Sequence, residues 1–173
     1  MGTFTTIPRD STKGVGGICY FLLCNLADVT IAVDSSMNTT ITAGDVSIGD
    51  AFVKFVTTKE TSNYTVTGTG TPTVGTSSWN QVLTAVFARN EALKVNQLKV
   101  MANSEMIAVV VDRNGDAWCL GNDSCSGLDL TSSTGTSGTG PNDLGGQTVT
   151  LSANSKYPES YVDAATLTSI TPA

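Results

Sequence analysis

The chain has no histidine, few charged side chains and no long apolar segment. Without histidine, Ser-His-Asp and Cys-His nucleophile systems, HExxH metal sites and imidazole-dependent zinc sites are excluded. Only 14% of residues are charged, and 15 acidic against 9 basic residues leave a net charge of −6, which is unsuited to binding phosphate backbones. The longest nearly apolar run, residues 18–26, is shorter than the ~20 residues of a membrane helix, so no membrane span is expected.

Small and β-branched residues are abundant instead. The chain has 27 threonines, 17 serines and 17 glycines among its 173 residues, a composition typical of strands and turns. Its length predicts a single domain spanning residues 1–173, and a hydrophobic content of 40% is sufficient for one core.

Hydrophobic patterns predict a mainly β fold, an all-β framework of roughly eight short strands with one helix inserted in the middle. Residues 18–26 are apolar enough for a strand buried on both faces. Residues 106–111 and 117–121 flank an Asn-Gly hairpin signal, and residues 147–153 alternate as a last strand.

The most regular alternation predicts one long antiparallel hairpin over residues 52–89, with the Gly- and Thr-rich residues 68–75 at its tip. In residues 79–89 the odd positions from Trp79 to Arg89 share one face. Such a hairpin has an exposed edge of low charge, which is an aggregation hazard in a monomer. An assembly partner would remove that hazard.

One flanking α-helix is predicted at about residues 90–102. Asn90 is a good N-cap, and Val95, Leu98 and Met101 recur at helical spacing. The remaining segments are predicted to be irregular: an N-terminal arm (1–17), a long loop (122–146) and a C-terminal tail (157–173).

The four cysteines, at positions 19, 24, 119 and 125, do not have the spacing of a zinc knuckle. Cys19 and Cys24 lie in one predicted strand, where a separation of five places them on opposite faces. Buried free thiols are the favoured interpretation, with a disulfide or a metal site as the alternatives.

No constellation of residues satisfies the rules of a catalytic or metal site. Residues 112–116 resemble the start of a calcium loop, but the glycine comes too early, so a hairpin turn is favoured. Asp123, Asp129 and Asp143 are candidates for calcium binding or for a carboxylate pair, yet no spacing rule is met. We therefore predict no catalytic residues, no cofactor and no metal, and a protein that is not an enzyme.

Three passages, in the same order, resemble the tail tube (major tail) proteins of tailed bacteriophages, especially those of Bacteroidetes-type hosts. The first is residues 16–22 followed by 27–30, similar to a "GGI…DVT" strand. The second, residues 110–121, is similar to a "V.D.NG..W.LG" hairpin. The third, residues 127–135 followed by 143–151, is similar to a "G…TG…D..G..LT" ending.

The resemblance implies a β-sandwich or barrel-like domain with one flanking α-helix. Copies of this domain would assemble into homohexameric rings that stack into a hollow tube conducting DNA from the capsid to the host cell. The partners would be further copies of the chain, other tail proteins, and phage DNA that passes through the lumen without specific binding. The location would be the virion tail, after synthesis in the host cytoplasm. The 52–89 hairpin would join neighbouring sheets around the lumen, and the arm, the 122–146 loop and the tail would contact adjacent rings.

The acidic balance agrees with this expectation, because a lumen lined with aspartate and hydroxyl groups does not bind phosphate. A capsid decoration protein, a head-fibre protein or another virion β-module is the alternative, since it shares the composition without ring closure. A binding module, or an Asp-dependent hydrolase in the long loop, is a third possibility.

Overall fold

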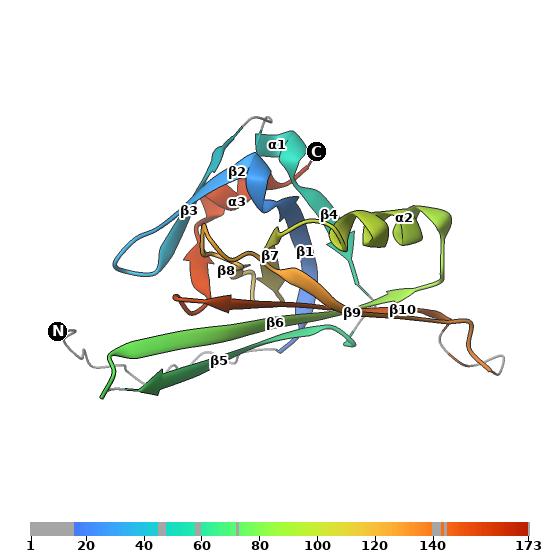
Figure 1. Cartoon of the computed structure of the whole chain (residues 1–173). Coiled ribbons are helices and arrows are strands. Elements are labelled where there is room, and N and C mark those ends of the chain that lie inside the picture. The colour runs from blue at the N-terminus through green and yellow to red at the C-terminus, as the bar shows by residue number, and fades with distance from the viewer. Residues whose placement is uncertain are drawn as a thin grey trace.

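The computed structural model describes residues 16–44, 48–57, 60–71, 73–139, 143 and 145–172. Within these residues, eleven strands form two sheets (Figure 1), so the predicted mainly β fold is confirmed. The predicted N-terminal arm (1–17) falls outside the described residues, apart from Gly16 and Gly17.

The seven-stranded sheet has the order β2-β3-β11-β8-β7-β1-β4, and the four-stranded sheet has the order β5-β6-β10-β9. The first contains β1 (Ile18–Asn25), β2 (Val29–Val33), β3 (Asn38–Ala43), β4 (Val53–Val56), β7 (Met106–Asp112), β8 (Ala117–Leu120) and β11 (Ser160–Val162). The second contains β5 (Asn63–Thr71), β6 (Thr76–Ala88), β9 (Asp129–Thr136) and β10 (Gly146–Ser155). The helices are α1 (Ile48–Ala51), α2 (Ala92–Met101) and α3 (Ala164–Ile170), with a 3-10 turn at Leu26–Asp28.

The two sheets enclose the main hydrophobic core. Leu83 and Leu151 of the four-stranded sheet pack with Val110 of the seven-stranded sheet, and all three are almost fully buried. Phe21 and Phe55 stack at 5.3 Å between ring centroids, and Phe87 of the opposite sheet lies within 6.2 Å of both. Aromatic contacts of this kind add to the burial energy that holds the sheets together.

The centre of the seven-stranded sheet is covered on both faces, as predicted for residues 18–26. Phe21 and Leu23 face the four-stranded sheet, whereas Leu22 and Cys24 belong to a second core with Ile170 of α3. α1 and α3 lie together on this outer side of the sheet (Figure 1). The sheet is therefore the middle layer of three.

The predicted hairpin over residues 52–89 is wrong in its first part. β5 and β6 do form a long antiparallel hairpin, from Asn63 opposite Thr84 to Thr71 opposite Thr76. β4, however, belongs to the other sheet, where Phe55 is paired with Phe21 of β1. Alternation places side chains on faces but does not identify the partner strand. Here the partner of β4 is β1, and Phe55 stacks on Phe21 across the pair.

The helix predicted at residues 90–102 is confirmed as α2. The residue at its N-cap position is Glu91 rather than Asn90, and Asn90 instead donates to the carbonyl oxygen of Thr136 at 3.1 Å. Leu98 and Met101 are buried as expected, whereas Val95 is 50% exposed.

Two segments predicted to be irregular contain regular structure. Within the predicted loop 122–146, β9 pairs with β10. The sequence of β9 is rich in threonine and serine, which suits a strand whose side chains are exposed to solvent. Such a strand lacks the alternation of apolar residues by which strands are predicted. Within the predicted tail 157–173, β11 joins the seven-stranded sheet and α3 follows it. Asp163 caps α3 by accepting from the Thr166 backbone N–H at 2.8 Å, and Ile170 is fully buried.

A buried polar network joins the two sheets near the end of β8. Gln81 of β6 accepts from the Gly121 N–H at 2.7 Å and donates to Asn122 Oδ1 at 3.2 Å. Asn122 in turn donates to Ser160 Oγ of β11 at 2.9 Å and accepts from Ser155 Oγ of β10 at 3.0 Å. Because all these polar groups are buried, each hydrogen bond replaces a lost contact with water.

Replacing Asn122 by alanine is expected to lower the free energy of unfolding by about 2–4 kcal/mol, because it removes the buried hydrogen bonds that the Asn122 amide makes with Gln81, Ser155, Pro158 and Ser160. Urea unfolding followed by circular dichroism measures this change. The matched control is Asn80→Ala, which removes an exposed amide bond to Asn154 and is expected to cost less than about 0.5 kcal/mol. Equal losses in the two variants would contradict the importance of the network.

Candidate functional site

The four-stranded sheet has one apolar face and one hydroxyl-rich face. Along β6, Gln81, Leu83, Ala85 and Phe87 are buried against the core, and the residues between them are only half-buried. β10 and β5 alternate in the same way. From the pairing, the outward side chains of the two central strands are Ser78, Asn80, Val82, Thr84, Val86, Thr148, Thr150, Ser152 and Asn154.

No lysine or arginine occurs in the four strands of this sheet, and Asp129 is their only charged residue. Six of the nine basic residues lie in the described part of the chain, all of them outside these strands: Lys54, Arg89, Lys94, Lys99, Arg113 and Lys156. Lysine and arginine bind phosphate groups and release the counterions condensed on DNA, and this release is the main source of nonspecific DNA affinity. Strands without these residues cannot contribute to it.

Both edges of the four-stranded sheet are formed by long, polar strands. β5 has nine residues and β9 has eight, and neither has a second partner strand among the described residues. Open edges of this length are templates for pairing with another chain. The β5–β6 hairpin also extends beyond the core, because the residues of its distal part are exposed. The Trp79 ring lies close over Gly68, and a Cβ atom at position 68 would be only 2.5 Å from the ring.

The carboxylates singled out in the sequence do not form a common site. In the described part of the chain, no three acidic or cysteine side chains are grouped as metal ligands. Asp123 is buried and pairs with Lys156 at 3.4 Å, which raises the pKa of Lys156. Asp143 accepts from the Thr139 N–H at 3.0 Å, and Asp129 lies exposed in β9.

The segment 112–116 is the turn of the β7–β8 hairpin. Asp112 Oδ1 accepts from the backbone N–H groups of Asn114 and Asp116 at 2.8 and 3.0 Å. Gly115 has a φ of +92°, a conformation that favours glycine. The Asp112 carboxylate therefore stabilises the turn.

The four cysteines are all free thiols, two buried and two exposed. Cys24 and Cys119 are buried as expected, whereas Cys19 and Cys125 are not. Cys19 lies where the register of β1 on β7 shifts between Ile18 and Tyr20, so Ile18 shares the core face with Phe21. This shift in register cannot be predicted from the sequence, because residues 18–26 are almost all apolar and show no alternation.

Comparison with known proteins leaves the family of this chain open. No protein-family model matches the chain, and neither a curated protein nor a solved structure matches it. Among the helices of the described residues, none has the length and apolar character needed to cross a membrane. The surfaces of the four-stranded sheet are the features with the clearest functional meaning.

Two of the four thiols are expected to react with an alkylating reagent in the folded protein, and all four after unfolding. Burial raises the pKa of Cys24 and of Cys119 from 9.0 to about 12, so both stay protonated in the folded state at pH 9. Intact-mass measurement counts the adducts. Modification of three or four thiols under native conditions would contradict the burial.

Stability is expected to decrease at alkaline pH for the same reason. The unfolded chain ionises these thiols near pH 9, whereas the folded chain does so only near pH 12. A raised pKa in the folded state therefore contributes stability below pH 9 that is lost as the pH rises toward about 12. Urea unfolding at pH 8 and pH 10.5 measures the loss. Replacing both Cys24 and Cys119 by alanine should reduce the difference between the two pH values.

Proposed function

We propose that this chain is a virion structural protein of a tailed bacteriophage, forming homohexameric rings that stack into the tail tube. The tube would carry phage DNA to the host cell during genome ejection. The observation that carries the proposal is the four-stranded sheet, which combines two polar edges that have no further partner strand among the described residues with four strands that contain no lysine or arginine. The sequence resemblance to tail tube proteins supports the same assignment.

In the proposed ring, neighbouring copies would be joined through the two different edges of this sheet. When β5 of one copy pairs with β9 of the next, the sheet continues from subunit to subunit and its open edges disappear. Such a heterologous contact closes into a ring of six when the rotation between copies is one sixth of a full turn without a shift along the axis, and otherwise it gives an open filament. Six copies of a four-stranded sheet give 6 × 4 = 24 strands.

The size of such a ring suits the passage of DNA. With strands about 4.8 Å apart, 24 strands span about 115 Å, a circle about 37 Å across at the backbone, which strand tilt widens further. In this arrangement the core face of the sheet points outward and its hydroxyl-rich face lines the channel. A wall of hydroxyl and amide groups lets DNA slide without being held.

The purified chain is expected to form rings with a central hole, and tubes at higher concentration. Negative-stain electron microscopy with class averaging tests this directly and reports the rotational symmetry. Monomers would contradict the proposal. Closed trimers would also contradict it and would favour the capsid decoration or head-fibre alternative.

A lysine placed on the lumen-facing side should make the tube retain DNA. Thr150 lies in the middle of β10 on the hydroxyl-rich face, so Thr150→Lys would place a ring of six positive charges in the channel. Particles assembled with a short duplex should co-sediment with it at low salt and release it as salt rises. The control is Thr168→Lys on α3, which adds the same charge away from the sheet. Equal retention by both variants would contradict this orientation of the sheet.

A further inference from the structure

Exposed apolar side chains are concentrated on β4 and α2. Of the seven large hydrophobic residues that are exposed in the described part of the chain, five belong to these two elements. They are Val53 (46% exposed), Val56 (69%), Leu93 (69%), Val95 (50%) and Val100 (54%). Single exposed apolar residues are ordinary, but a concentration of them marks an interaction surface.

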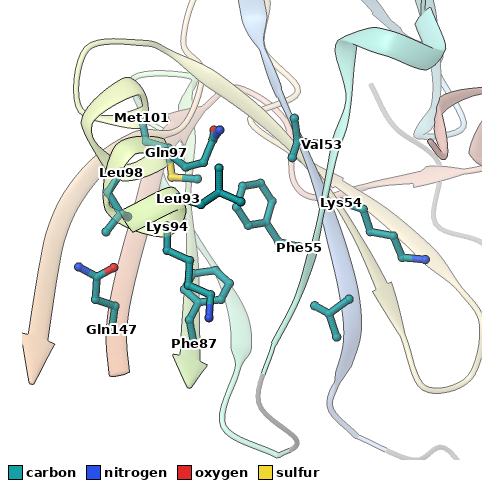
Figure 2. Close-up of a pocket in the computed structure, with 11 residues that line it drawn as sticks. Val53, Lys54, Phe55, Phe87, Leu93, Lys94, Gln97, Leu98, Met101 and Gln147 are labelled. Carbon is teal, nitrogen blue, oxygen red and sulfur yellow. The ribbon is translucent and has the colours of Figure 1, made fainter. Parts of the chain in front are cut away.

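β4 and α2 form the walls of an apolar groove (Figure 2). One hollow, of about 230 Å³, has Phe55 on one side and Leu93 on the other, and Val56 of β4 also lines it. A second hollow, of about 220 Å³, shares Phe55 and Gln97 and continues toward Val100. We call Val53, Val56, Leu93, Gln97 and Val100 the β4–α2 surface.

The groove also contains an unused hydrogen-bond acceptor. Gln147, at the start of β10, lines the first hollow, and its side-chain Oε1 is buried without a hydrogen-bond partner among the described residues. A buried amide oxygen without a partner is costly, and a donor from an incoming chain would remove that cost. β4 is in addition an edge strand of its sheet, so its outer backbone groups are open to pairing.

The β4–α2 surface is continuous with the open edge of β9. At the start of α2, Asn90 donates to the backbone oxygen of Thr136 at the end of β9. At its end, Met101 and Ala102 line a hollow together with Asp129 and Leu130 at the start of β9. α2 thus runs along β9, and β9, α2 and β4 form one side of the molecule.

We propose that the β4–α2 surface is the apolar part of the contact between adjacent copies of this chain, covered by the copy whose β5 pairs with β9. This inference rests on the proposed ring. A stable interface buries about 800 Å² on each partner, and permanent assemblies are the more apolar ones. β9 offers backbone groups and hydroxyls, with Leu130 its only large apolar residue. The apolar area must come from beside it, and the β4–α2 surface supplies it.

Charge substitutions on the two walls of the groove test the proposal. Leu93→Glu and Val56→Glu each place a carboxylate where the adjacent copy would bury it, and should raise the concentration needed for half-assembly by about tenfold or more. The matched control is Val95→Glu, because Val95 is exposed on the same helix but lines neither hollow. Light scattering and negative-stain microscopy measure assembly, and circular dichroism checks that each variant is folded.

The outcomes separate this inference from the proposed function. Rings that form equally well with Leu93→Glu, Val56→Glu and Val95→Glu would overturn the inference and leave the tail tube proposal standing. An unmodified chain that stays monomeric would overturn both. If the charged variants fail to fold, hydrogen exchange of the unmodified protein decides: β4 amides should exchange more slowly in the assembly than in dilute monomer, and unchanged exchange would overturn the inference.

Discussion

The hydrogen bonds that converge on Gln81 and Asn122 hold the two sheets in a fixed relation to each other. Apolar burial between sheets is nondirectional, so on its own it tolerates sliding, whereas buried amide groups require particular partners. Gln81 belongs to the four-stranded sheet, and Asn122 reaches Ser160 in the seven-stranded sheet. Because these bonds lie on the core side, the outer face and both edges of the four-stranded sheet remain available for contacts with other molecules.

The surfaces that remain differ in chemical character. The outer face of the four-stranded sheet is rich in hydroxyl and amide groups, its edges offer backbone hydrogen bonds, and the side formed by β4 and α2 is apolar. Basic residues such as Lys94 and Arg113 are held outside this sheet, where they pair with Glu91 and Glu60. Among the described residues, the fold therefore keeps lysine and arginine out of all four strands of this sheet.

Local patterns in the sequence predicted faces and turns better than strand partners. Alternation in β6 predicted that Leu83 and Phe87 share one face, and Asn114-Gly115 predicted the β7–β8 turn. The pairing of β4 with β1 brings together Phe55 and Phe21, which are far apart in the sequence, and β9 has almost no apolar residues to reveal it. Asp163 was a readable signal for α3. The sequence does not reveal that the four strands without lysine or arginine belong to one sheet, because this depends on how the strands pair.

The low charge of the outer face also bears on how rings could close. If the proposed lumen were lined with carboxylates, six copies would place like charges close together, and their repulsion would oppose assembly. Hydroxyl and amide side chains avoid this repulsion and still give phosphate nothing to bind. Asp129 is the one exception, and it lies at the β9 edge, where a neighbouring copy would pair. In the proposed tube, most of the net charge of −6 would therefore lie outside the channel, and the channel would be close to neutral.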